Sequence, residues 1–403
     1  MKLRSKETYW LLKNGLITSY PSLQKDVSCE VLIIGGGITG SLMAYQLSRE
    51  GYQTLLIDKR DIAMGSTSAT TAMLQYEIDE PLHLLIDKVG KNAAVDSFRE
   101  GVLAIDDLEK IVKEVKADCG FRKKHSLYIA DSKRNLEWLE LEYTARKKYH
   151  FEVQWLTQTQ LKTQFGILGE GGILSKAGAS VDAYNLSHAL LTHSVKHYGL
   201  SVFDHTSAEN FEYSKQGNAV TTDTNCVIRC KHIVFATGYE TQSMLKKKIV
   251  SLISTYAFVS EPLNHMPPAI VNTLFWNTQD PYLYLRSTDD NRILVGGGDE
   301  DFKNPIRRDR LIESKEKFLV ECAQKLLPGL MLIPDFAWAG TFGVTKDALP
   351  FIGPHIDHPN SYFVLGFGGN GITFSVMGMK IISDALSGKH NKFLEYYSFN
   401  RKF

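Results

Sequence analysis

Residues 29–40 read Cys29-Glu30-Val31-Leu32-Ile33-Ile34-Gly35-Gly36-Gly37-Ile38-Thr39-Gly40, and this stretch indicates how the chain begins to fold. Its apolar run is short enough for a buried parallel strand, and residues 41–50 then show the apolar spacing of a helix. A second apolar run at 54–57 ends in Asp58. Strand, glycine-rich turn, helix and strand together predict a βαβ unit of the kind that binds dinucleotides.

Three glycines in this turn have different physical roles. Gly35 permits the tight turn, Gly37 lets a pyrophosphate approach the backbone, and Gly40 lets the helix pack close to the strand. The amides and dipole at the helix start would hold the phosphate, and Asp58 would accept the ribose hydroxyls of an adenosine. A lone glycine-rich turn also occurs without a nucleotide, but here the strand, the helix and the acid accompany it.

Three later stretches point to the same ligand. Residues 65–73, directly after the second strand, are small or hydroxyl-bearing, so they can offer amide and hydroxyl donors to a diphosphate. The apolar runs 233–236 and 362–365 are each followed by a glycine turn, and ligands bind at such strand ends in open α/β sheets. We therefore expect both ends of the chain to belong to one nucleotide domain, although an ordinary turn remains the alternative for 65–73.

The composition is that of a globular protein without a strong overall electrostatic field. The chain has 403 residues, of which 43% are hydrophobic, and this length suggests two or three domains. The formal net charge of +1 excludes a global field that recruits nucleic acid or an anionic membrane. The five cysteines form no CxxC pair, which favours a cytoplasmic location and gives no metal site. No segment approaches the ~20 continuous apolar residues of a membrane span.

The chain resembles the FAD-dependent amine and amino-acid oxidoreductases of the D-amino acid oxidase superfamily, which include glycine oxidase, sarcosine oxidase and gamma-glutamylputrescine oxidase. The resemblance covers nearly the whole chain and rests on the joint order and spacing of these motifs: 31–40, Asp58, 65–68, 233–238, 292–297, 349–353 and 366–372. Segments 67–72 and 281–286 are most similar to a branch whose members sometimes carry an extra Rieske iron–sulfur domain.

This resemblance, together with the length, implies an α/β fold with two discontinuous domains after an N-terminal arm at 1–26, which Tyr9 and Trp10 would anchor. A Rossmann-like FAD-binding domain with a mostly parallel sheet would comprise residues 27–85, 155–240 and 330–403. A substrate-binding domain, built on a mixed or antiparallel sheet with helices, would comprise residues 86–154 and 241–329.

The resemblance also implies where FAD binds. The residues expected to contact it are Gly35, Gly37, Ile38, Thr39, Gly40, Asp58, Lys59, Arg60, Ser66, Thr67, Thr70, Thr71, Ala72, Met73, Ala208, Ala236, Thr237, Gly238, Gly343, Gly368, Gly369, Asn370, Gly371, Ile372 and Thr373. Amides of the last group would face the pyrimidine end of the flavin, where the reduced ring carries negative charge.

FAD is expected to be held without a covalent bond. Some relatives tether it through a histidine just after the serine/threonine loop, or through a cysteine just before the C-terminal Pro-x-Ile-Gly motif. The corresponding neighbourhoods here are Ala72-Met73-Leu74 and Gly340-Thr341-Phe342, which supply neither nucleophile.

The implied reaction is oxidation of the CH–NH bond of an amine or small amino acid by hydride transfer to flavin N5, with oxygen reoxidising the flavin. Arg286 is expected to bind a substrate carboxylate with two parallel hydrogen bonds; a solvated hairpin arginine is the alternative. Lys346 is a candidate for the flavin edge, with an exposed loop lysine as the equal alternative. Tyr256 and Tyr284 are candidates for the pocket wall, with an ordinary core or surface position as the alternative. Two other functions stay open: a dehydrogenase that passes electrons to a quinone or carrier protein, and a non-catalytic flavin-binding redox sensor or scaffold.

Overall fold

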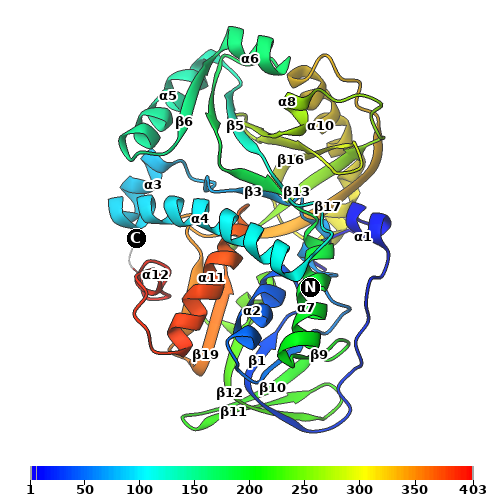
Figure 1. Cartoon of the computed structure of the whole chain (residues 1–403), viewed down its shortest axis with the longest axis vertical. Coiled ribbons are helices and arrows are strands. Elements are labelled where there is room, and N and C mark those ends of the chain that lie inside the picture. The colour runs from blue at the N-terminus through cyan, green and yellow to red at the C-terminus, as the bar shows by residue number, and fades with distance from the viewer. Residues whose placement is uncertain (1, 6, 402–403) are drawn as a thin grey trace.

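The structure, a computed structural model, describes residues 2–5 and 7–401. Two large sheets make up its two halves along the longest axis, and the helices α3 (Leu82–Val89) and α4 (Lys91–Val115) run across the molecule between them (Figure 1). The mixed α/β class expected from the sequence is confirmed. A small third sheet joins β3 (Met73–Gln75), β8 (Gly178–Ser180) and β4 (Arg122–Lys123).

The first sheet contains the βαβ unit predicted from residues 29–58. Strand β1 pairs in parallel with β2 on one side and with β12 on the other. The strand order is β10 (Ala208–Ser214), β11 (Gly217–Thr222), β12 (Val227–Phe235), β1 (Val27–Ile34), β2 (Thr54–Ile57) and β9 (Ser201–Phe203), with β19 (His358–Leu365) beside β12 and β18 (Phe351–His355) beside β19. The N-terminal and C-terminal parts of the chain therefore share this sheet, as the repeated glycine turns predicted.

Alternate residues of β1 pack into two different hydrophobic cores, which explains why the whole run is apolar. Val31 and Ile33 belong to the core beneath the helices, and Leu32 and Ile34 to the core on the opposite face. The helices packed against one another on the first face are α2 (Ile38–Arg49), α7 (Ala183–Tyr198) and α11 (Gly371–Leu386).

The second sheet is antiparallel except where β14 and β5 run in parallel. Its order is β17 (Pro334–Val344), β13 (Ser251–Ser260), β16 (Ile293–Asp301), β15 (Leu283–Ser287), β14 (Thr273–Asn277), β5 (His125–Ala130), β7 (Gly171–Ser175) and β6 (Val153–Thr157). The remaining helices are α5 (Lys133–Lys148), α6 (Gln158–Phe165), α8 (Pro268–Val271), α9 (Pro305–Arg310), α10 (Ile312–Leu326) and α12 (Phe393–Tyr396).

Sheet membership differs from the expected domain boundaries in two places. Strands β6 and β7 lie in the second sheet, although residues from 155 onward were expected in the FAD domain. Strand β17 also joins the second sheet, although residues from 330 onward were expected in the first. The apolar pattern of a strand shows that it is buried but does not identify its partner, so these crossovers left no local signal.

The N-terminal segment contains a short helix, α1 (Tyr9–Asn14), whose first two side chains are buried. Ser5 donates its amide to Ala339 O on β17, and Trp10 Nε1 donates to Thr70 O at 2.6 Å. The segment therefore lies against the second sheet and the serine/threonine loop, with Tyr9 and Trp10 buried at the contact.

Candidate functional site

A cavity of about 530 Å³ extends between the glycine turn of the first sheet and strands β13 and β15 of the second. Most residues expected to contact FAD or substrate line it: Gly35, Gly37, Ile38, Thr39, Asp58, Lys59, Arg60, Ser66, Thr67, Thr70, Thr71, Ala72, Met73, Ala208, Ala236, Thr237, Gly238, Gly368, Gly369, Asn370, Gly371, Ile372, Tyr256 and Tyr284. Segments far apart in the sequence thus meet at one cavity.

Three expected cofactor residues lie just behind the cavity wall. A Cβ at Gly40 would overlap the Gly35 carbonyl oxygen, so this glycine allows α2 to approach β1. The Gly343 carbonyl accepts a hydrogen bond from the Gly368 amide at 2.9 Å, and Thr373 Oγ1 donates to Gln75 O at 3.0 Å. Each supports a neighbouring segment and is absent from the lining.

The glycine turn has the shape that a dinucleotide diphosphate requires. Gly35 has a φ of +108°, and a Cβ there would lie 2.5 Å from Ala236 O. Thr67 Oγ1 accepts the Ile38 amide at 2.9 Å, which joins the loop to the start of α2. Ser66 Oγ is buried in the cavity wall without a hydrogen-bond partner among the described residues. The glycine turn without side chains, the start of α2 and the unpaired Ser66 hydroxyl all fit the diphosphate of FAD.

Asp58 is held in place by backbone amides at the end of β2. Its Oδ2 accepts the Gly36 amide at 2.7 Å, and its Oδ1 accepts the Arg60 amide at 2.9 Å. Burial raises the pKa of this carboxyl, while the two amides oppose the rise. A carboxylate offers about four acceptor positions, so two remain for the ribose hydroxyls that the sequence assigned to it.

The loop after β2 is fixed from its outer side by three side chains. Successive carbonyls each accept one hydrogen bond: Ala69 O from Trp338 Nε1 at 2.9 Å, Thr70 O from Trp10 Nε1 at 2.6 Å, and Thr71 O from Arg286 Nε at 2.6 Å. The loop that lines the cavity is thereby held by the N-terminal helix and by two strands of the second sheet.

Arg286 does not occupy the place expected for a substrate ligand. Its side chain is buried, lies outside the cavity lining, and also donates to Ser287 O and Val181 O, both at 3.1 Å. Burial lowers the pKa of this guanidinium to about 10. Arg286 shares a strand face with Tyr284, but the Thr71 backbone covers it. This geometry agrees neither with carboxylate binding nor with a solvated hairpin residue, and it makes Arg286 a positioning residue.

Lys346 is exposed in the segment after β17 and is absent from the cavity lining. The structure therefore does not bring it to the cavity where the other expected residues meet. Tyr256 and Tyr284, in contrast, line that cavity, together with Tyr282.

The sequence analysis missed two carboxyl groups in this region. Asp79 lines the cavity, and its Oδ2 accepts the Gly369 amide at 2.7 Å. Asp299, on β16, lies beside Thr255 and Tyr282, and burial together with the negative charge of Asp79 raises its pKa to about 7. Neither acid can be singled out from the sequence, because each stands among other acidic residues. Only the tertiary structure shows which of them lies near the cavity.

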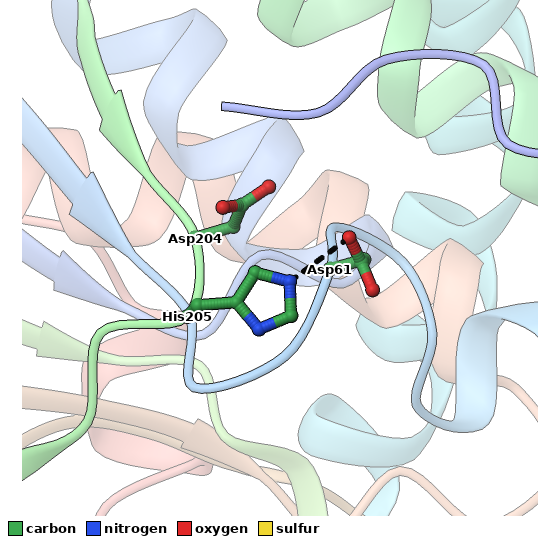
Figure 2. A group of neighbouring side chains, drawn as sticks. All are labelled: Asp61, Asp204 and His205. Atoms are coloured by element: carbon green, nitrogen blue, oxygen red, sulfur yellow. Dashed lines mark hydrogen bonds and ion pairs between the residues drawn. The ribbon is translucent and has the colours of Figure 1, made fainter. Parts of the chain in front are cut away.

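Asp61, Asp204 and His205 form a group of potential metal ligands near the edge of the first sheet (Figure 2). His205 Nε2 pairs with Asp61 Oδ1 at 3.1 Å, and this contact raises the pKa of the imidazole. Asp204 Oδ2 accepts the Tyr20 amide at 2.8 Å. The Asp204 contact fastens the N-terminal segment to the end of β9, and the His205–Asp61 contact joins the segments after β9 and β2. We assign no metal to the group.

Comparison with known proteins places this geometry in a family. A family model described as FAD dependent oxidoreductase matches residues 30–385. The chain belongs to this family. FAD is therefore its cofactor, and the residues of the cavity fit that group.

Relatives match over almost the whole chain at low identity. A putative Rieske 2Fe-2S iron-sulfur protein of Bacillus subtilis is 25% identical over 98% of this chain and 75% of its own length. The gamma-glutamylputrescine oxidoreductase of Escherichia coli is 23% identical over 96% of this chain and 90% of its own. The crystal structure of glycine oxidase from Geobacillus kaustophilus superposes with a TM-score of 0.78 at 19% identity, covering 93% of this chain and 99% of that one. That likeness shows a shared fold.

FAD is expected to be released when the holoprotein is precipitated with acid. Among the described residues, the cavity lining contains no histidine or cysteine, the two nucleophiles through which relatives tether the flavin. Yellow colour should therefore appear in the supernatant, measured by its absorbance after centrifugation. A yellow pellet that survives washing in acid would show a covalent bond.

Within the described residues, none of the helices combines the length and the apolar character needed to cross a bilayer.

Proposed function

We propose that this protein oxidises the CH–NH bond of an amine or a small amino acid to an imine, with oxygen as the final electron acceptor. The observation that carries the proposal is a single cavity that joins the dinucleotide turn of β1 to a chamber walled by Tyr256, Tyr282 and Tyr284. A substrate in that chamber would share one cavity with FAD. Bound FAD would supply the hydride acceptor, so the chain needs no nucleophile of its own.

The chain's own contribution is to orient both reactants and to provide a favourable electrostatic environment. Asn370 Nδ2 donates to Glu77 O at 2.7 Å, which holds the segment before α11 against the segment after β3. The start of α11, at Gly371, lies in the cavity wall. Backbone amides and the helix dipole there favour negative charge, as the reduced cofactor requires. The tyrosine rings exclude water from the reacting carbon and align it.

Anaerobic mixing with a panel of amines and amino acids tests this proposal. We expect at least one amine to bleach the absorbance of the bound flavin under argon, and air to restore it with release of peroxide. Bleaching that only a dye or quinone reverses would instead identify a dehydrogenase. Flavin in stoichiometric amount that no amine bleaches would favour a redox sensor or scaffold and contradict the proposal.

A further inference from the structure

The chamber beside the flavin-binding turn is acidic and aromatic. Of the described residues that line the cavity, the basic ones are Lys59 and Arg60, and both pair with Glu240 beside Asp58. At the other end, Glu77 and Asp79 line the wall among tyrosine and tryptophan rings. Glu77 is paired with the buried Arg146 at 3.2 Å, whereas Asp79 has no ion-pair partner among the described residues. An α-carboxylate in that chamber would therefore meet carboxyl groups and π-faces without a cationic partner, which is unfavourable.

Asp299 lies outside the cavity lining, beside Tyr282, which does line it. Its Oδ1 is buried without a hydrogen-bond partner among the described residues, although Thr255 and Tyr282 lie beside the carboxyl. The cation that acts on Asp299 is Lys315, on α10, which pairs with Glu300 Oε1 at 2.8 Å, donates to Gly298 O at 2.8 Å and lies 5.3 Å from the centre of the Tyr256 ring. An unpaired buried acceptor of this kind is costly unless a donor fills it.

We propose that Asp79 and the rings of Tyr282 and Tyr284, supported by the Asp299 carboxyl beside Tyr282, form a binding site for a second, positively charged nitrogen of the substrate, so that diamines are preferred to amino acids. Carboxylates and aromatic faces together are the groups that attract an alkylammonium ion. This inference rests on the proposed amine oxidation and identifies its substrate class.

The chemistry of amine oxidation explains why only a second nitrogen can supply the positive charge that the acidic site binds. The reacting nitrogen must lose its proton before its neighbouring carbon can give up a hydride, because the lone pair stabilises the developing imine. A bound monoamine then carries no positive charge in the chamber. A bound diamine keeps one ammonium group, which pairs with Asp79 and is attracted by the Asp299 carboxyl beside Tyr282.

Three probes with the same carbon chain separate the possibilities. Putrescine ends in an ammonium group, n-butylamine in a methyl group and gamma-aminobutyrate in a carboxylate. Binding to the holoprotein is read from the concentration that half-saturates anaerobic bleaching. We expect putrescine to saturate at a concentration at least about tenfold lower than n-butylamine, and gamma-aminobutyrate to bind most weakly. Equal saturation by putrescine and n-butylamine, or a preference for gamma-aminobutyrate, would overturn the inference.

Matched variants test whether Asp299 and Asp79 cause the preference for putrescine over n-butylamine. Asp299→Asn should weaken putrescine binding about 10- to 100-fold and leave n-butylamine within about twofold. Asp301→Asn, an exposed acid on the same strand, is the control and should change neither. Unfolding temperature and flavin content show whether Asp299→Asn folds, and Asp79→Asn supplies a second variant. A folded Asp299→Asn and Asp79→Asn that both keep the wild-type preference would refute the site.

The pH dependence supplies a readout that a purely structural role would not change. The groups that face Asp299 are Asp79, Lys315, Tyr282 and Tyr284. Because the pKa of Asp299 is raised to about 7, the carboxyl is neutral below that pH and negative above it. Putrescine binding should therefore strengthen as the pH rises through about 7, and this step should vanish in Asp299→Asn.

A non-oxidisable diamine separates this inference from the proposed reaction. A putrescine analogue without hydrogens on the carbons beside its nitrogens can bind but cannot be oxidised, so its affinity is measured by calorimetry. If it binds with the Asp299 dependence while no amine bleaches the flavin, the reaction fails and the site stands. If amines bleach the flavin but the analogue does not bind, the reaction stands and the diamine site is refuted.

Discussion

Alanine in place of Gly40 is expected to give a protein that purifies without FAD and is less stable by at least about 3 kcal/mol, a large overpacking effect. The added Cβ would overlap the Gly35 carbonyl oxygen and lie 2.9 Å from its carbonyl carbon. Both atoms are backbone, so no side chain can rotate away. The start of α2 must move from β1, and the turn that approaches the diphosphate then loses its shape.

Gly329→Ala is the matched control for this change. Gly329 is exposed, and a Cβ there would meet nothing within 4 Å. It should keep the wild-type ratio of flavin to protein absorbance and the wild-type unfolding temperature. A yellow, equally stable Gly40→Ala protein would show that the helix and strand are not as closely packed as the structure indicates.

The second large effect is expected for Arg286→Ala, which should lower the free energy of unfolding by about 3 kcal/mol and weaken FAD binding about tenfold or more. The guanidinium donates to three carbonyls, including Thr71 O at 2.6 Å. Its loss removes this donor from Thr71 O and Val181 O, whereas Ser287 O keeps its bond from Lys124 Nζ at 3.1 Å. The cavity loop is then less well ordered before FAD binds. Denaturant unfolding and titration of the apoprotein with FAD measure the two effects.

The Michaelis constant distinguishes this role from the carboxylate role expected at first. Once FAD saturates the variant, substrate should half-saturate Arg286→Ala at the wild-type concentration, because Arg286 does not line the cavity. The exposed Arg134 supplies the control variant, Arg134→Ala, which should alter neither stability nor FAD affinity. A selective loss of affinity for carboxylate substrates in Arg286→Ala would contradict the positioning role.

The FAD site could be predicted largely from sequence because its parts are local. Gly35, Gly37 and Gly40 act through the backbone of one turn, and Asp58 ends the next strand, so their spacing alone specifies their relative positions. The turns after 233–236 and 362–365 follow the same rule, since parallel strands in one sheet present their carboxyl ends at the same edge. These positions can therefore be predicted without knowing which distant residues pack against them.

The substrate side could not be predicted in this way. Arg286 and Tyr284 lie on the same face of β15, and Tyr282 directly precedes this strand. The fold nevertheless covers the arginine with the Thr71 backbone and leaves the two tyrosine rings in the cavity wall. Asp299 and its exposed neighbour Asp301 carry the same carboxyl group on one strand, and only the tertiary packing buries one of them.

Residues 29–58 alone therefore identified a dinucleotide turn, because backbone geometry in a βαβ unit depends on near neighbours in sequence. The order of the other motifs along the chain extended this to FAD. The tertiary structure decided which charges face the substrate, since that depends on where β13, β15, β16 and the segment after β3 meet. Arg286, expected to bind a carboxylate, instead supports the loop that lines the cavity. Asp79, which carries no sequence signal, lines the chamber, and Asp299 lies beside Tyr282 behind it.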